Sequence, residues 1–211
     1  MKKAFLVLAG LGLTLAAFAQ GPFICTTEGA KLVYVTTDAK GNESSQTDME
    51  IVKVAGKGDD FTIKQKAQLY IGGAALTKPI ETVTTVKGGD VLFDFGGIAI
   101  AAEGGGFVLP KNLEVGMELP TGEVTVEMLG IKSKQNITSH KVVAKEELTV
   151  PAGTYDCYVV ERQFTAKVLG MKTNGSMKTW YARGIGAVRM DNYDKKGKVT
   201  SSQVLKEVVL P

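Results

Sequence analysis

Apolar and polar residues alternate with a period of two along most of the chain, a pattern typical of half-buried β-strands. Glycine-rich turn signals separate these segments at intervals of roughly 8 to 12 residues, and the chain holds 25 glycines. We expect strands at residues 31–36, 47–55, 61–70, 80–86, 91–95, 123–129, 137–150, 154–168, 175–182, 185–193 and 199–210. The pattern predicts an all-β protein of one domain, an antiparallel sandwich or barrel with little helix.

Three segments depart from simple alternation. Between residues 154 and 168 neither face of the predicted strand is consistently polar, so we expect that strand to be covered on both sides over part of its length. Residues 111–118 are the one place where we expect a short helix. The glycine-rich segment 96–106 is either a mobile surface loop or a lid over the mouth of a cavity.

The N-terminus has the features of an export signal. A basic pair at residues 2–3 precedes an apolar run at residues 4–19, whose last residues, Ala17-Phe18-Ala19, fit a small-x-small cleavage site. The run is short for a membrane span, which needs about 20 apolar residues. We therefore expect a signal peptide over residues 1–19, a single mature domain over residues 20–211, and no transmembrane segment in the mature chain.

The position of the cysteines bears on lipid anchoring and on oxidation. A lipoprotein signal would place a cysteine directly after Leu8-Ala9-Gly10, but Leu11 follows there. We expect an exported protein of the periplasm, the outer envelope or the extracellular space that is not lipid-anchored. Outside the cytoplasm an even number of cysteines more often indicates a disulfide than free thiols. We therefore predict a bond between Cys25 and Cys157, with two buried, unpaired thiols as the alternative.

No catalytic or metal-binding motif stands out from the sequence. His140 is the only histidine and lies in a predicted strand, without Cys, His or acidic residues at zinc-site spacing. Ser176 lacks the second glycine of a Gly-x-Ser-x-Gly turn. The 25 lysine and arginine residues, less Lys2 and Lys3 of the signal, nearly balance the 22 acidic residues, which argues against a nucleic-acid surface. We expect a non-enzymatic protein with no metal, no cofactor and no nucleic-acid partner.

These observations fit a binding module better than an enzyme. Barrel-like sheets of this size enclose one small apolar ligand in some proteins. We expect a lipid or other hydrophobic molecule to contact five residues on the strands of the second half: Tyr155, Val159, Phe164, Met177 and Trp180. The competing interpretation is that these residues form an ordinary all-β core. A second functional hypothesis is a structural or interaction module that pairs an exposed sheet edge with an envelope protein partner.

Two stretches resemble a known family. Residues 150–160 (VPAGTYDCYVV) and 179–188 (TWYARGIGAV), followed by the turn at 193–198 (YDKKGK), are similar to the bacterial envelope family called domain of unknown function 3108 and to related TapB-like proteins. The start at residues 25–29 (CTTEG) is also similar. The resemblance implies an open, strongly curved β-barrel like that of lipoprotein-carrier proteins, in the periplasm or outer envelope. It carries no catalytic residues to this chain.

Overall fold

The computed structural model describes residues 21–76, 78–92, 101–103, 108–128, 131–168 and 171–211. Within these ranges the secondary structure consists of β-strands and contains no helix. The strands are β1 (Lys31–Asp38), β2 (Glu43–Lys57), β3 (Asp60–Ile71), β4 (Ala74–Ala75), β5 (Ile80–Lys87), β6 (Asp90–Leu92), β7 (Ala101–Glu103), β8 (Val108–Leu109), β9 (Gly122–Met128), β10 (Ile131–Val150), β11 (Gly153–Val168), β12 (Met171–Ala182), β13 (Gly186–Asp194) and β14 (Val199–Val209).

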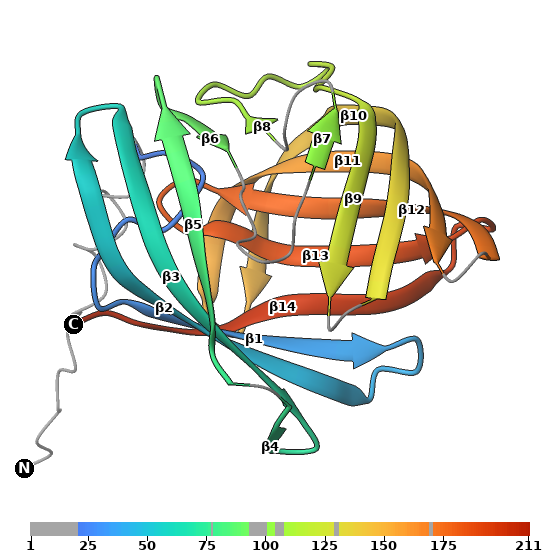
Figure 1. Cartoon of the computed structure of the whole chain (residues 1–211), viewed down its shortest axis with the longest axis horizontal. Coiled ribbons are helices and arrows are strands. Elements are labelled where there is room, and N and C mark those ends of the chain that lie inside the picture. The colour runs from blue at the N-terminus through green and yellow to red at the C-terminus, as the bar shows by residue number, and fades with distance from the viewer. Residues whose placement is uncertain (1–20, 77, 93–100, 104–107, 129–130, 169–170) are drawn as a thin grey trace, which may run out of the picture.

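All the strands belong to one antiparallel sheet, in the order β7-β9-β10-β11-β12-β13-β14-β1-β2-β3-β5-β6-β8, with β4 paired to β3. The sheet rolls so that β9 to β14 face β2, β3 and β5 across the interior (Figure 1). Its two ends are short strands of three and two residues, and β7 and β8 are not neighbours in this order. The predicted all-β fold, a single strongly curved sheet forming an open barrel, is confirmed.

The chain after β8 crosses the gap between the two ends of the sheet. The Gly116 N–H donates to the Val142 carbonyl at 2.8 Å, the Val142 N–H donates to the Met117 carbonyl at 2.9 Å, and the Leu119 N–H donates to the His140 carbonyl at 2.8 Å. The prediction of a short helix at residues 111–118 is therefore wrong. The segment's backbone groups bond across to β10 instead of along a helix, and Gly116 has a φ of 95°, which a right-handed helix does not allow.

Strand alternation gives the sheet a buried concave face and an exposed convex face. On β3 and β5, Ile63 and Val86 are almost fully buried. The intervening positions face solvent: Val83 is 42% exposed, and Lys64 pairs with Glu81 at 2.6 Å. Successive strand residues point to opposite faces, so the concave side is the one that carries the hydrophobic core.

Register shifts bend the sheet. They occur between Val33 and Tyr34, between Ile51 and Lys53, between Val142 and Ala144, and between Trp180 and Tyr181, among other places. Such bulges increase the local twist and bend the strand that carries them. On β11 the neighbouring residues Val159 and Val160 are both 3% exposed. The two faces of β11 are thus both covered over part of its length, as the sequence predicts.

The first described residues belong to the core. Phe23 is 1% exposed, its ring meets the Tyr158 ring edge-on at 5.6 Å, and the Arg183 guanidinium lies 4.5 Å from its centroid. The Gly184 N–H donates to the Pro22 carbonyl at 2.7 Å. The described residues from Pro22 onward are therefore part of the folded domain. The signal peptide itself, residues 1–19, lies outside the described residues and stays a prediction.

The predicted disulfide between the two cysteines is not confirmed by the structure. Cys25 and Cys157 are free thiols in the buried core, 1% and 0% exposed. The Cys157 Sγ donates to the Tyr155 carbonyl at 3.5 Å. Burial raises the pKa of both thiols, that of Cys157 to about 12, with the charges of Asp156 and Glu146 adding to the effect. Both side chains behave as small apolar core residues.

We predict that Gly56→Ala destabilises the protein more than Gly58→Ala, although the two glycines are only two residues apart, Gly56 at the end of β2 and Gly58 in the β2–β3 turn. Gly56 has a φ of 139°, and a Cβ there would lie 2.4 Å from the Asp60 carbonyl oxygen. Gly58 has a φ of 60° with open space around it, so its substitution costs only about 1 kcal/mol of left-handed strain. We expect about 3 kcal/mol or more for Gly56→Ala, measured by urea unfolding. Equal losses would contradict the close contact.

We also predict that both thiols of the native mature protein resist iodoacetamide at about pH 8, because burial shields them and keeps them protonated. In urea, without any reductant, both should be alkylated completely, as counted by intact mass. If instead the unfolded chain takes up label only after reductant is added, the two cysteines are bonded and the free thiols of the structure are contradicted.

Candidate functional site

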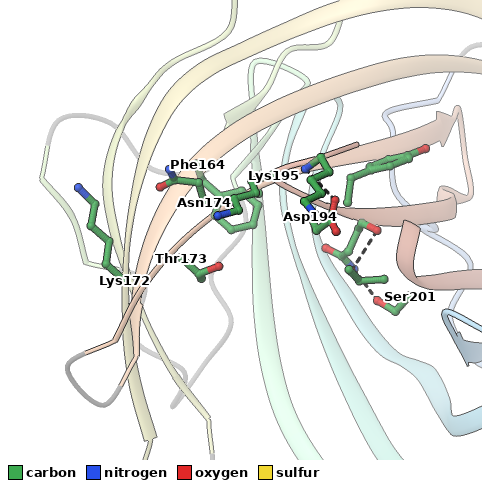
Figure 2. A pocket seen from close by; sticks show the side chains of 12 residues that line it. Phe164, Lys172, Thr173, Asn174, Asp194, Lys195 and Ser201 are labelled. Atoms are coloured by element: carbon green, nitrogen blue, oxygen red, sulfur yellow. Dashed lines mark hydrogen bonds between the residues drawn. The ribbon is translucent and has the colours of Figure 1, made fainter. Parts of the chain in front are cut away.

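An open pocket of about 800 Å³ lies at one end of the sheet, beside the β11–β12 and β13–β14 turns (Figure 2). Cross-strand register places Phe164 opposite Gly175, and Gly175 opposite Asp194, so these three positions share one face of the sheet. Alternation along β11 also gives that face Val160, which belongs to the core. The pocket is lined by Phe164, Lys172, Thr173, Asn174, Gly175, Asn192, Tyr193, Asp194, Lys195, Lys196, Thr200 and Ser201.

Phe164 is the aromatic side chain at the inner end of this pocket. Its ring lies over Gly175, where an added Cβ would be 3.3 Å from Phe164 Cζ and 2.9 Å from the Tyr193 carbonyl oxygen. A bare backbone at this strand position therefore makes room for the ring. On its other side, Arg162 Cζ is 5.8 Å from the ring centroid, and Arg162 Nη2 is 3.4 Å from Met177 Sδ. Phe164 thus lies between the pocket and the half-buried Arg162 guanidinium.

The interior next to Phe164 is polar as well as apolar. Burial lowers the pKa of Arg162, and the nearby Tyr181 partly offsets this. His140, opposite Arg162 in the β10–β11 register, is 4% exposed, and its Nδ1 is 3.0 Å from the Pro120 carbonyl oxygen. Burial lowers the pKa of His140, the Arg162 charge lowers it further, and the Pro120 contact opposes the change. At neutral pH the His140 imidazole is therefore uncharged.

Positive charge predominates around the pocket mouth. Lys172, Lys195 and Lys196 line the pocket with one acidic residue, Asp194. The Asp194 Oδ1 accepts hydrogen bonds from the backbone N–H groups of Lys198 and Lys196, at 2.9 and 2.8 Å. These bonds lower the pKa of Asp194 and keep its carboxylate charged. The carboxylate therefore stabilises its own turn, while the three lysines are exposed.

The five residues expected to bind a ligand are divided between two places. Phe164 lines the pocket and Met177 contacts Arg162 beside it. Val159 pairs with Trp180 across β11 and β12, and alternation puts these two on the face opposite Phe164.

Trp180 and Tyr155 are held by hydrogen bonds within the protein. The indole Nε1 of Trp180 donates to Glu146 at 2.6 Å, and the Tyr155 hydroxyl donates to the Ala152 carbonyl at 3.1 Å. The sequence identified the strands that carry the site. It did not indicate the face, and it did not identify the pocket lysines.

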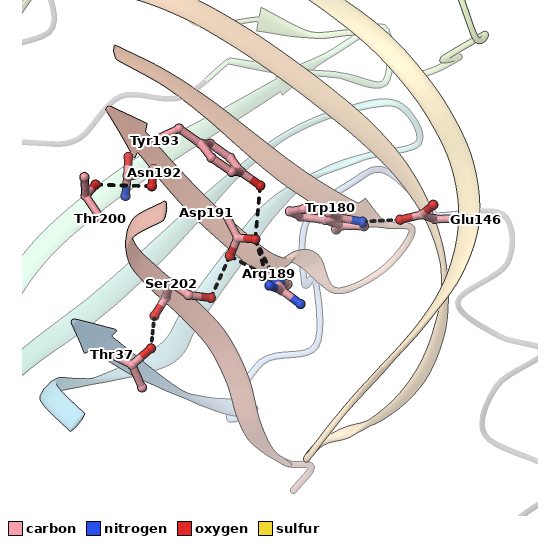
Figure 3. Close-up of polar contacts among 9 residues, drawn as sticks. All are labelled: Thr37, Glu146, Trp180, Arg189, Asp191, Asn192, Tyr193, Thr200 and Ser202. Carbon is pink, nitrogen blue, oxygen red and sulfur yellow. Dashed lines mark hydrogen bonds and ion pairs between the residues drawn. The ribbon is translucent and has the colours of Figure 1, made fainter. Parts of the chain in front are cut away.

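A buried carboxylate on the convex face was not identified from the sequence either (Figure 3). Asp191 is 2% exposed and accepts bonds from Arg189 at 2.8 to 3.1 Å and from the Ser202 hydroxyl at 2.6 Å. The Tyr193 hydroxyl donates to it at 3.4 Å, and the Arg189 guanidinium lies 5.2 Å from the Trp180 ring. These contacts join β13 to β14 and serve packing. The alternation of Arg189, Asp191 and Tyr193 along one strand was the available sequence signal.

The glycine-rich segment 96–106 lies largely outside the described residues. Of the segment 96–106, only residues 101–103 are described, as β7 paired to β9, so the lid hypothesis lies outside the described residues. Across the described ranges, no three or more His, Cys, Asp or Glu residues gather where they could hold a metal ion. In the same part of the chain no helix is long and apolar enough to cross a membrane.

We predict that His140 makes the protein less stable in mild acid. An unfolded histidine has a pKa of about 6.5, and the folded value is lower, so the unfolded chain binds the extra proton first. Stability is therefore full above about pH 6.5 and falls as the pH drops towards the folded pKa. His140→Gln should flatten this part of the curve of unfolding free energy against pH, because His140 is the only histidine. Parallel curves for both proteins would contradict the buried, neutral imidazole.

Comparison with known proteins places this fold. A family model described as DUF3108-like matches residues 27–205. A candidate exported protein with a YmcC-like fold from Bacteroides fragilis has a TM-score of 0.76 at 17% identity, over 90% of this chain and 99% of that one. A candidate lipoprotein from Parabacteroides distasonis has a TM-score of 0.73 at 19% identity, over 90% and 99% of the two chains.

These identities show a shared fold, and no curated protein matches the chain. The family model, in contrast, spans all the strands from β1 to β13 and part of β14. Its range contains both stretches, residues 150–160 and 179–188, on which the resemblance to domain of unknown function 3108 was based. The chain belongs to the DUF3108-like family.

Proposed function

We propose that this is an exported, non-enzymatic envelope protein that binds a lipid or another hydrophobic molecule in its curved sheet. The observation that carries the proposal is the open pocket of about 800 Å³ beside Phe164. Ligand cavities commonly have volumes of about 300 to 1,000 Å³, so this one is large enough for a lipid-sized molecule. The family membership and the export signal at residues 1–19 support the location.

The apolar part of the ligand would lie against Phe164. This side chain is half-buried, so part of its ring is available to a ligand. Met177, also half-buried, adds a flexible side chain next to Arg162. Methionine adapts to apolar partners of different shapes. Val159, Trp180 and Tyr155 would support the sheet without touching the ligand.

Lipid anchoring and partner binding are separate questions. The related Parabacteroides distasonis structure is named as a lipoprotein, whereas Leu11 in this chain occupies the position of a lipid-carrying cysteine. We propose a protein that is exported without an anchor. Pairing of a sheet edge with a protein partner has less support, because within the described residues the two end strands, β7 and β8, have three and two residues. Strand addition needs an edge long enough to form a hydrogen-bonded ladder.

The proposal is tested by native mass spectrometry of the chain from Gln20 onward, exported in a bacterial host, with solvent extraction and lipid analysis of any adduct. We expect a stoichiometric adduct that extracts as a lipid or fatty acid. Phe164→Ser should lose the adduct, because it removes the apolar contact in the pocket. Val83→Ser, on the exposed convex face, is the matched control and should keep it.

Two results would contradict the proposal. One is a clean apo mass for the wild type that persists after incubation with a lipid extract. The other is an adduct that Phe164→Ser retains at wild-type occupancy while its thermal unfolding shows a folded protein, because the ligand would then lie elsewhere.

A further inference from the structure

We infer that the pocket beside Phe164 selects ligands with an anionic head group, so that its ligand is an anionic amphiphile. This inference rests on the proposed function and specifies the chemistry of the same site. The head group would lie near Lys195 and Lys196, which line the pocket, and the apolar part against Phe164. In Figure 2 the Lys195 side chain lies between Phe164 and Asp194, whereas the Lys172 ammonium points away from them.

The residues that line the pocket carry a net positive charge. Three lysines line it against a single aspartate. Both hydrogen bonds that Asp194 Oδ1 accepts come from backbone N–H groups of its own turn, those of Lys196 and Lys198. These bonds hold the Asp194 carboxylate in its turn, and its one negative charge is outnumbered by the three lysines. Lys198 is exposed on the same turn and adds to the positive field.

Among the described residues, the pocket lysines differ from several other lysines in their ion pairs. Several lysines of the described sheet form ion pairs: Lys64 and Lys66 with Glu81, Lys111 with Asp59, Lys134 with Glu123, Lys141 with Glu118 and Lys178 with Glu161. Within the described ranges no such ion pair involves a lysine of the pocket. The ammonium groups at this end of the sheet are therefore available to an anion from outside.

Uncharged polar side chains line the pocket together with the lysines. Asn174 Oδ1 accepts a hydrogen bond from the Thr165 hydroxyl at 3.0 Å, which leaves the Asn174 amide hydrogens as donors. Thr173 lies beside it on β12, and the Ser201 hydroxyl accepts from its cross-strand partner Asn192 at 3.1 Å. Neutral donors next to ammonium groups are suited to phosphate and carboxylate oxygens.

The experiment compares probes with the same twelve-carbon chain and different head groups. Isothermal titration of the mature protein, below micelle-forming concentrations and at low salt, would use dodecyl phosphate, dodecylphosphocholine, dodecyl maltoside and inorganic phosphate. We expect dodecyl phosphate to bind roughly fivefold to tenfold more tightly than the zwitterionic and neutral probes, since two or three exposed charge pairs contribute modestly each. The preference should shrink as salt is added.

Matched variants locate the effect. Lys195→Gln with Lys196→Gln should abolish the preference for dodecyl phosphate while leaving dodecyl maltoside binding unchanged. Lys53→Gln with Lys57→Gln removes the same charge from exposed positions on β2 and should retain the preference. If the first double variant retains it, the site assignment is overturned.

The remaining outcomes separate this inference from the proposed function. Equal affinity for the three amphiphiles would overturn the anionic head group and leave hydrophobic binding intact. Binding of none of them would count against the proposed function itself. Inorganic phosphate that binds as tightly as dodecyl phosphate would overturn the amphiphile and indicate a site for the free anion.

Discussion

A single sheet with no helix to pack against must cover its apolar face by rolling over on itself, and the described part of this chain is built under that constraint. The strands from β7 to β8 form one hydrogen-bonded series, so most of the core lies on the concave side of one layer, while Val159 and Trp180 are buried on the other face. Residues such as Ile51, Ile63 and Leu205 are buried to within 1% only because distant strands curve round to meet them. The bulges supply that curvature, since each adds local twist.

The same constraint explains why a pocket forms at one end of the roll. The core is continuous in the middle, where Phe23 at the N-terminal end of the domain and the segment between β8 and β9 add buried side chains. Towards the β11–β12 and β13–β14 turns, the concave face changes to small and polar residues such as Gly175, Asn192 and Ser201. Side chains of this size do not fill the space, and Phe164 remains half-exposed at the boundary. The pocket thus follows from where the apolar pattern stops.

Much of the fold could be predicted from the sequence, and the reason is local. Period-two alternation and turns such as Asp194 to Lys198 depend on neighbouring residues, so the strand positions agree closely with the structure. What failed depends on distant contacts. The segment at residues 111–118 forms backbone hydrogen bonds with β10 instead of a helix. The two cysteines are buried as free thiols. Alternation alone puts Val159 and Phe164 on opposite faces, and likewise Met177 and Trp180, because each pair is an odd number of residues apart. Which of the two faces looks into the interior depends on how distant strands curve round, so the sequence pattern did not indicate it.

We propose that the concave face at the end of β11 to β14 binds an amphiphile. The most direct measurement is a crystal structure of the mature chain with dodecyl phosphate. We expect the alkyl chain to pack against Phe164 and the phosphate to lie within hydrogen-bonding distance of Lys195 or Lys196. An alkyl chain bound on the convex face near Trp180, or a pocket filled by the protein's own side chains with the amphiphile elsewhere, would contradict it.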